Sequence, residues 1–133
     1  MRFDPYLYFD GACREAFEFY QRATGGTLTT MMTYGESPMA AAVGAATADK
    51  IIHATLMIDG SALLGSDAMP GRYRPPQGFA VTMQADTPEA AERIFAGLSD
   101  GAEIVMPLQE TFWAKRFGQL TDRYGINWML NCD

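Results

Sequence analysis

Hydrophobic and polar positions follow the same order twice along this chain. In each half, a short strand-like run leads into a stretch whose apolar residues recur at helical spacing, and further strand-like runs come after it. The runs 6–9 and 78–84 open the two halves, and Asp59-Gly60 and Tyr124-Gly125 precede the last run of each. Because self-similarity at a period near half the chain indicates a duplicated unit, the pattern predicts two βαβββ modules.

The first half is predicted to contain one long helix over residues 12–24. From Ala16 onward its apolar positions recur at i, i+3, i+4 and i+7. Gly25-Gly26 should end it, because glycine adopts the left-handed C-terminal conformation without strain. The alanine-rich segment 35–49 is predicted to be an excursion with one short helix, either a lid or a tolerated loop. Predicted strands cover residues 6–9, 27–34, 51–58 and 61–66.

The second half carries a strong helix start at Asp86-Thr87-Pro88-Glu89. It combines a capping side chain, an early proline and an acid at the positive end of the helix dipole. The helix is predicted to run over 89–98. In the strand before it, we expect Phe79, Val81 and Met83 to face the core. The remaining predicted strands cover residues 103–108, 112–121 and 126–132.

Together these elements predict a single α+β domain over residues 1–133. Repeat one covers about 1–67, a proline-containing linker about 68–77, and repeat two about 78–133. A hydrophobic content of 48% is enough to fill a core in a chain of this length. We expect the modules to bring two curved mixed sheets together around a cleft.

Strand side chains alternate between two faces, so the sequence also predicts which residues face away from the helices. In the strand 51–58 the apolar set beginning at Ile52 should pack on a helix, which leaves His53 and Thr55 on the other face. Residues predicted to be buried are Phe19, Ile52, Leu56, Phe95 and Trp128. Residues predicted to line the cleft are Tyr6, Tyr8, His53, Thr55, Trp113, Arg116, Asn127, Met129 and Asn131.

His53 is the only histidine and the candidate catalytic residue. It is either a hydrogen-bonded residue of the cleft wall or a general base, and a base would need an orienting partner. Glu36, Asp67 and Glu110 are the candidate carboxylates for that role.

Arg116 suits a carboxylate or phosphonate group of a ligand, because a guanidinium binds such groups through two parallel hydrogen bonds. The alternative is an ion pair with an acid such as Glu110 or Asp122. Strand parity separates Arg116 from Lys115, so at most one of the two faces the cleft.

Composition excludes several classes of partner. The chain has ten basic and 16 acidic residues and a net charge of −6, so we expect no nucleic acid binding. No run of apolar residues is long enough for a membrane helix, and we expect no membrane association. Cys13 and Cys132 lack metal-type spacing, which favours free thiols in a reducing cytoplasm.

The C-terminal run from Gln109 to Gly118, followed by Thr121-Asp122-Arg123-Tyr124-Gly125, Trp128-Met129 and Asn131, resembles the signature of PhnB-like proteins. These belong to the vicinal oxygen chelate superfamily, with glyoxalase I and bleomycin resistance proteins. The first half agrees with the resemblance at Pro5-Tyr6-Leu7, Tyr34-Gly35-Glu36, His53-Ala54 and Ser66-Asp67-Ala68-Met69-Pro70. The resemblance implies paired βαβββ modules and a homodimer.

Enzymes of this superfamily hold a divalent metal with one side chain from each of strands one, four, five and eight. Carried onto this chain, the strand-four and strand-eight positions become Leu64 and Met129, and the strand-five position lies among residues 78–80. Only Asp4 offers a carboxylate, and one carboxylate does not make a site. No glycine-rich strand-to-helix loop for an adenosyl group is present. We therefore expect no tightly held metal and no other cofactor.

The sequence thus predicts a cytoplasmic homodimer that binds an unidentified small molecule in its cleft. One alternative is a metal-dependent lyase, isomerase or dioxygenase of the same superfamily. The other is a metal-free acid–base enzyme that uses His53.

Overall fold

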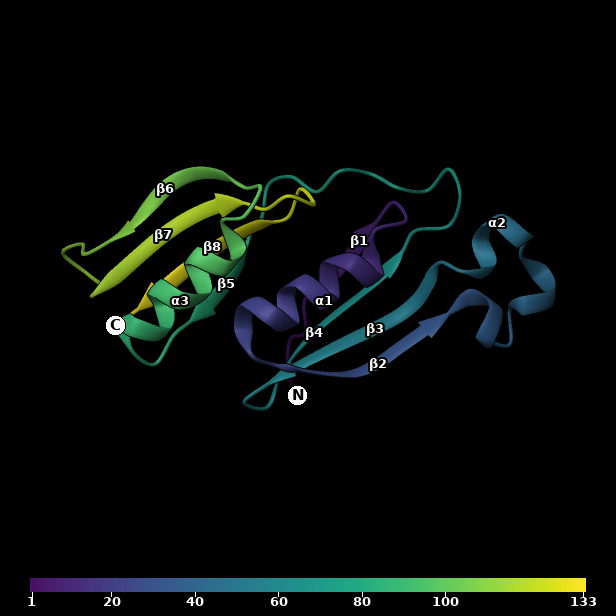
Figure 1. The fold of residues 1–133 in the computed structure, drawn as a ribbon, viewed down its shortest axis with the longest axis horizontal. Helices are drawn as coiled ribbons and strands as arrows, with labels where there is room; N and C mark the ends of the chain where they lie inside the picture. The colour runs from purple at the N-terminus through teal and green to yellow at the C-terminus, as the bar shows by residue number, and fades with distance from the viewer. The chain divides into compact units, whose positions relative to one another are not determined.

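The computed structural model describes residues 1–133, which form two compact units, Met1–Arg74 and Pro75–Asp133 (Figure 1). The first unit contains one four-stranded sheet and the long helix α1 (Cys13–Thr24). Its strands are β1 (Tyr6–Phe9), β2 (Thr27–Thr33), β3 (Ile51–Ile58) and β4 (Ser61–Asp67).

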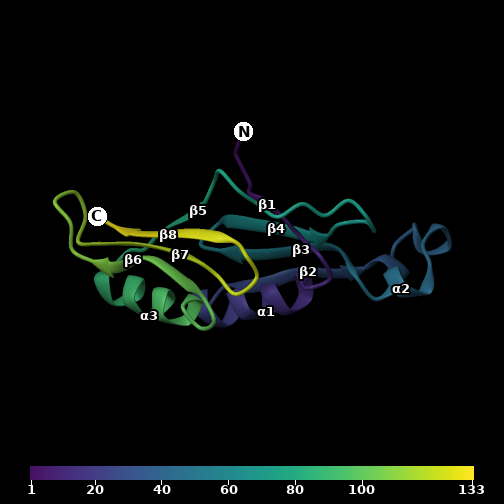
Figure 2. The same ribbon diagram turned by 90° about the horizontal axis from the view of Figure 1, so that it is seen from above.

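The strands of the first sheet lie in the order β1-β4-β3-β2. β1 and β4 are parallel, and the other two pairs are antiparallel, so the sheet is mixed. Helix α1 covers one face of this sheet (Figure 2). It ends at Gly25, whose φ of 79° is the left-handed conformation expected from the glycine pair.

The core of the first unit lies between α1 and the sheet. Leu7 and Phe9 of β1 are buried against the helix, where Phe9 meets the ring of Phe17 edge-on at 6.1 Å between centroids. Gly65 of β4 belongs to the same layer, and a Cβ there would lie 2.5 Å from the Phe17 ring. Glycine is therefore the residue that lets α1 approach this close to the sheet.

The predicted burial of Ile52 is wrong, although Phe19 and Leu56 are buried as predicted. Ile52 is half-exposed, and Ile51 is buried in its place. The reason is local, because the β2–β3 register shifts beside Ile51 and its amide donates to the buried carboxylate of Asp67 at 2.8 Å.

The excursion after β2 contains three short helical turns rather than one. They are η1 (Tyr34–Glu36), η2 (Ala40–Ala42) and α2 (Ala45–Ala48), and they lie beyond the ends of β2 and β3 (Figure 1). A capping box starts the first turn: the Glu36 amide donates to the Thr33 hydroxyl at 3.1 Å, and the Thr33 amide donates to the Glu36 carboxylate at 3.0 Å.

The second unit repeats this arrangement. Its strands lie in the order β5-β8-β7-β6, with β5 and β8 parallel and the other pairs antiparallel. The duplicated βαβββ architecture and the α+β class predicted from the sequence are confirmed. The elements are β5 (Val81–Gln84), α3 (Pro88–Leu98), β6 (Glu103–Gln109), β7 (Arg116–Thr121) and β8 (Asn127–Cys132).

Two predictions for the second unit are wrong. Phe79 does not face the core but is 54% exposed, because it follows Gly78 at a φ of 82° and precedes β5. The strand predicted over 112–121 begins only at Arg116. The amide of Ala114 donates to the Thr111 hydroxyl at 3.1 Å, which turns the chain before the strand starts.

Trp128 and Phe95 are buried in the second unit, as predicted. The indole N–H of Trp128 donates to Oδ2 of the buried Asp122 at 2.8 Å. Oδ1 of Asp122 accepts from the amides of Tyr124 and Ile126, which fixes the turn into β8. None of the helices in this structure has the length and hydropathy needed to cross a bilayer.

Candidate functional site

The first sheet has one face that α1 does not cover, and we call it the open face of the first unit. Tyr6 pairs with Leu64 and Tyr8 with Ser66 across β1 and β4, while Thr55 of β3 pairs with Leu64. Because these residues alternate with the buried Leu7, Phe9 and Gly65, they point away from the helix. The parity predicted for Tyr6, Tyr8, His53 and Thr55 therefore agrees with the register.

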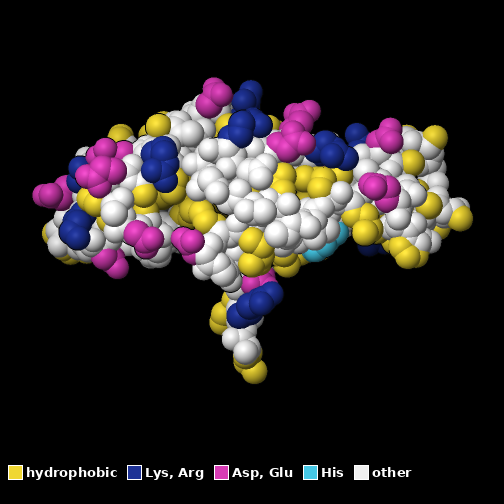
Figure 3. Space-filling view, turned by 60° about the horizontal axis from the view of Figure 1, so that its bottom comes forward, with side chains coloured by type: hydrophobic (Ala, Val, Ile, Leu, Met, Phe, Trp, Pro, Cys, Tyr) yellow, Lys and Arg dark blue, Asp and Glu magenta, His cyan; other side chains and the backbone are white.

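His53 lies on this open face, at the surface beside hydrophobic side chains (Figure 3). Its Nδ1 is 3.4 Å from the Tyr6 hydroxyl, and its Nε2 is 3.3 Å from the Thr55 hydroxyl. The Tyr6 ring stacks on the imidazole with 5.9 Å between centroids. His53 is thus oriented by two hydroxyl groups, and neither Asp67 nor Glu36, the two candidate carboxylates of the first unit, fills that role.

The Tyr6 phenol contacts both His53 and Tyr8. Burial raises the pKa of Tyr6 above its ordinary value, and a hydrogen bond from Ser66 opposes that shift. Its ring lies 5.1 Å from the ring of Tyr8. Tyr6 therefore stays protonated at neutral pH and can hold His53 or a ligand through a neutral hydrogen bond.

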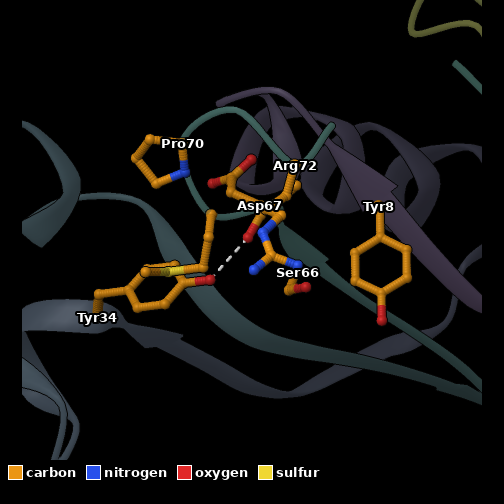
Figure 4. A pocket seen from close by; sticks show the side chains of 8 residues that line it. Tyr8, Tyr34, Ser66, Asp67, Pro70 and Arg72 are labelled. Carbon is orange, nitrogen blue, oxygen red and sulfur yellow. Dashed lines mark hydrogen bonds between the residues drawn. The ribbon is translucent and has the colours of Figure 1, made fainter. Parts of the chain in front are cut away.

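A pocket of about 540 Å³ adjoins this face at the end of β4 (Figure 4). Tyr34 and Tyr8 stand on opposite sides of it, with the side chain of Arg72 between them in this view. The volume is in the range of pockets that hold small metabolites. The lining residues, all from the first unit, are Tyr8, Tyr34, Ser66, Asp67, Ala68, Met69, Pro70 and Arg72.

Asp67 lines the pocket, but its carboxylate is engaged within the protein. The side chain is 2% exposed, and its two oxygens accept hydrogen bonds from the amides of Cys13 at 3.0 Å and Ile51 at 2.8 Å. It ties the first turn of α1 to the start of β3. Asp67 therefore has a structural role, and the prediction that it could orient His53 is not supported by this geometry.

Glu36 is also engaged elsewhere, because its carboxylate accepts from the amide and the hydroxyl of Thr33. These bonds hold the pKa of Glu36 below its ordinary value. Glu36 caps a helical turn and does not contact the imidazole.

Tyr34 is a buried wall of the pocket. Its hydroxyl donates to the backbone carbonyl of Asp67 at 2.9 Å, which Figure 4 marks with a dashed line. Burial raises the pKa of Tyr34 above its ordinary value, and the nearby Tyr6 and Asp67 raise it further. The ring is therefore held in place by one neutral hydrogen bond.

Replacing Tyr34 by phenylalanine should lower the free energy of unfolding by about 1 kcal/mol, because one buried hydrogen bond is lost. Its folded-state pKa is raised above the ordinary value near 10.0, so the stabilising contribution is present below pH 10 and is lost as pH rises through the folded pKa. Urea unfolding at pH 7 and in alkaline buffers should show the wild type losing stability more steeply than Y34F. The half-buried Tyr73 gives the control Y73F, and identical alkaline profiles for the wild type and Y34F would contradict the role of Tyr34.

Arg72 lines the pocket although the sequence predicts only a linker over residues 68–77. Pro70 and Gly71 occupy the central positions of a turn closed by the Arg72 amide donating to the Met69 carbonyl at 2.9 Å. Gly71 has a φ of 77°, as a type II turn requires. The sequence does contain a signal for this position, because a Pro-Gly pair stands directly before the arginine. Such a pair predicts a tight turn, and the turn determines where the backbone of Arg72 lies.

The second sheet presents an open face of its own, away from α3. Thr82 pairs with Met129 and contacts its sulfur at 3.7 Å, and the Thr121 hydroxyl donates to Asn127 at 2.8 Å. Asn131 donates to the side-chain oxygen of Gln84 at 2.8 Å. The two asparagines and Met129 thus point away from the buried Trp128, as the parity of β8 predicts.

Arg116 does not take the predicted place on the open face. It pairs with Cys132 in the register, and its guanidinium donates to Glu92 of α3 at 2.9 and 3.0 Å. The ion pair anticipated as the alternative therefore exists, with Glu92 in place of Glu110 or Asp122. Trp113 lies in the loop before β7, where its ring meets Phe117 at 5.4 Å.

The residues at the strand positions that hold metal in superfamily enzymes do not fit a hard divalent ion. The sheet register places Tyr6 beside Leu64 and Thr82 beside Met129, where the sequence predicted Asp4 and one of residues 78–80, so these pairs offer a phenol, a hydrocarbon, a hydroxyl and a thioether. Asp4 precedes β1 and pairs with Arg2 at 2.9 Å. No three His, Cys, Asp or Glu side chains are grouped as a metal site anywhere in the chain.

Comparisons with known proteins agree with this architecture. Residues 2–130 match the model of the Glyoxalase/Bleomycin resistance protein/Dioxygenase superfamily. Protein YjdN of Escherichia coli strain K12 is 37% identical over 139 residues, which cover 98% of this chain and 95% of that protein.

Two solved structures are similar over the whole chain. The crystal structure of protein PA1353 from Pseudomonas aeruginosa is 42% identical with a TM-score of 0.91, covering 100% of this chain and 98% of that one. A PhnB protein from Bacillus cereus, 24% identical with a TM-score of 0.81 and 100% coverage of both chains, shares the fold. The chain belongs to the glyoxalase/bleomycin resistance protein/dioxygenase superfamily.

Proposed function

We propose that this protein binds a small molecule on the first unit, in the pocket at the end of β4. The lining of this pocket supports the proposal, because it combines hydroxyl and guanidinium donors with apolar side chains. Pockets of this kind recognise small ligands because the apolar wall supplies affinity and a few polar groups fix the orientation. The adjoining residues Tyr6, His53 and Thr55 extend the donor surface across the open face.

The test is a fragment titration followed through methionine methyl groups. The chain has nine methionines, and Met69 lines the pocket. In a sample labelled with ¹³C at the methionine methyls, ligands of the pocket should shift the Met69 signal, assigned with M69L. Met106 of the second unit serves as the reference signal. A library in which no compound shifts Met69 would refute binding at this pocket.

A metal-free acid–base reaction remains the second candidate, and the contact between Tyr6 and His53 favours it. The two hydroxyl contacts hold the imidazole in one orientation, and a ligand would replace one of them to give its proton to the freed nitrogen. Catalytic turnover of a bound ligand that H53Q abolishes without weakening binding would support this candidate over a binding protein. The open face of the second unit, with Asn127, Met129 and Asn131, stays a predicted binding surface.

We also propose that the protein carries no stoichiometric divalent metal and has no glyoxalase activity. The donor chemistry at Leu64 and Met129 supports this, because neither side chain can replace water around zinc, nickel or magnesium. Elemental analysis after dialysis should find well below one metal ion per chain. About one ion per chain, or conversion of the methylglyoxal–glutathione adduct after adding nickel or zinc, would contradict this prediction.

We further propose a homodimer in the cytoplasm. β6 is an edge strand of its sheet, and its Val105 is 60% exposed, so an apolar strand edge is open to pairing. Sedimentation at micromolar concentration should give about 29 kDa, twice the chain mass of 14.6 kDa. A mass of one chain would contradict the dimer. The free thiols of Cys13 and Cys132 support a reducing compartment.

A further inference from the structure

Resting on the proposed function, we infer that the pocket of the first unit selects organic acids. The ligand is a small molecule in which an oxyanion, either a carboxylate or a phosphate monoester, is joined to a compact apolar body. Arg72 binds the oxyanion, and the apolar lining holds the body.

The charge of Arg72 is available to a ligand. No carboxylate lies within ion-pair distance of its guanidinium. The only acid that lines the pocket is Asp67, and backbone amides occupy both of its oxygens. The pocket therefore contains one positive charge that no acid neutralises. This local charge is opposite in sign to the net charge of the protein, which is −6. A local positive site of this kind favours an anion of matching planar or tetrahedral geometry.

Hydroxyl groups of the lining complete the recognition of an oxyanion. The Tyr8 hydroxyl makes no hydrogen bond within the protein and can donate to a ligand, while Ser66 is buried beside Tyr6. The Tyr34 hydroxyl is already used by the Asp67 carbonyl, so Tyr34 contributes its ring. The expected contacts of the oxyanion are thus a guanidinium and a phenol that have no competing partner.

The lining also offers apolar side chains for the body of the ligand. Ala68, Met69 and Pro70 line the pocket together with the ring of Tyr34, and the hydrogen bond from the Arg72 amide to the Met69 carbonyl closes the turn of this segment. Methionine adapts its shape to different apolar groups. A volume of about 540 Å³ exceeds that of an inorganic anion by a wide margin, so the pocket has room for an apolar body beside the oxyanion.

The experiment compares benzoate, phenyl phosphate and the neutral benzamide, titrated into the full-length protein and followed at Met69. We expect benzoate or phenyl phosphate to bind at least about tenfold more tightly than benzamide, because a hydrogen-bonded charge is gained. Which of the two binds better identifies the kind of oxyanion. R72Q should weaken that binding by about tenfold or more, and R72K should weaken it less.

R74Q is the matched control, because Arg74 is an exposed arginine of the same loop that does not line the pocket. Its binding should stay within about twofold of the wild type, and equal melting temperatures would verify the fold of each variant. The inference is wrong if benzamide binds as tightly as the acids, if neither acid binds, or if R72Q and R74Q behave alike. The proposed function survives these results if a neutral fragment shifts Met69, and fails with the inference only if no compound does.

Discussion

Trp128→Ala should lower the free energy of unfolding by about 3–5 kcal/mol, which is a large share of the stability of a domain of this size. Trp128 is 2% exposed, and its removal would leave a cavity between β8 and the neighbouring core. The substitution also deprives Asp122 of the indole donor at 2.8 Å. Since the other oxygen of Asp122 fixes the turn into β8, the loss should extend to the strand.

Chemical denaturation monitored by circular dichroism measures this effect. Trp113→Ala is the matched control, because Trp113 is the second tryptophan and is 51% exposed in a loop. That variant should lose less than about 1 kcal/mol. If the two substitutions cost the same, the face assigned to β8 is wrong.

Asp67→Ala is expected to cost about 3 kcal/mol or more. The buried carboxylate accepts two backbone hydrogen bonds, and bonds to a charged group contribute about 1.5–3 kcal/mol each. Alanine would leave the amides of Cys13 and Ile51 buried without partners. The acceptor of the Tyr34 hydroxyl is the backbone carbonyl of residue 67, which alanine keeps, so the expected loss comes from the carboxylate alone.

Thermal unfolding of Asp67→Ala and Asp67→Asn separates the contribution of the hydrogen bonds from that of the negative charge. Asparagine keeps one accepting oxygen and should recover part of the loss. The exposed Asp10 gives the control D10A, which should stay close to the wild type. A melting temperature of Asp67→Ala equal to that of D10A would show that the carboxylate does not join α1 to β3.

Much of the fold follows from local patterns in the sequence. The repeat, the glycine pair after α1 and the capping signal before α3 are properties of neighbouring residues, and each predicts its element correctly. The errors arise where a distant or side-chain contact decides the outcome. Ile51 is buried because Asp67 binds its amide, and the Thr111 hydroxyl delays the start of β7.

The candidate site was only partly predictable for the same reason. Alternation along β1 and β3 is sufficient to place Tyr6, Tyr8, His53 and Thr55 on one face. The prediction for Arg116 is wrong because strand parity only places Arg116 and Lys115 on opposite faces and does not say which face each takes. The ion pair with Glu92 of α3 places Arg116 on the helix-covered face. Arg72 was not predicted because its position depends on a turn that brings a loop back to the end of β4.

The most direct test of small-molecule binding in the pocket at the end of β4 is a crystal structure. The crystals are grown with the fragment that binds most tightly in the Met69 titration. We expect ligand density in the first unit, between the rings of Tyr8 and Tyr34 and beside the guanidinium of Arg72. Density for the ligand at another place, with this pocket holding only solvent, would contradict it.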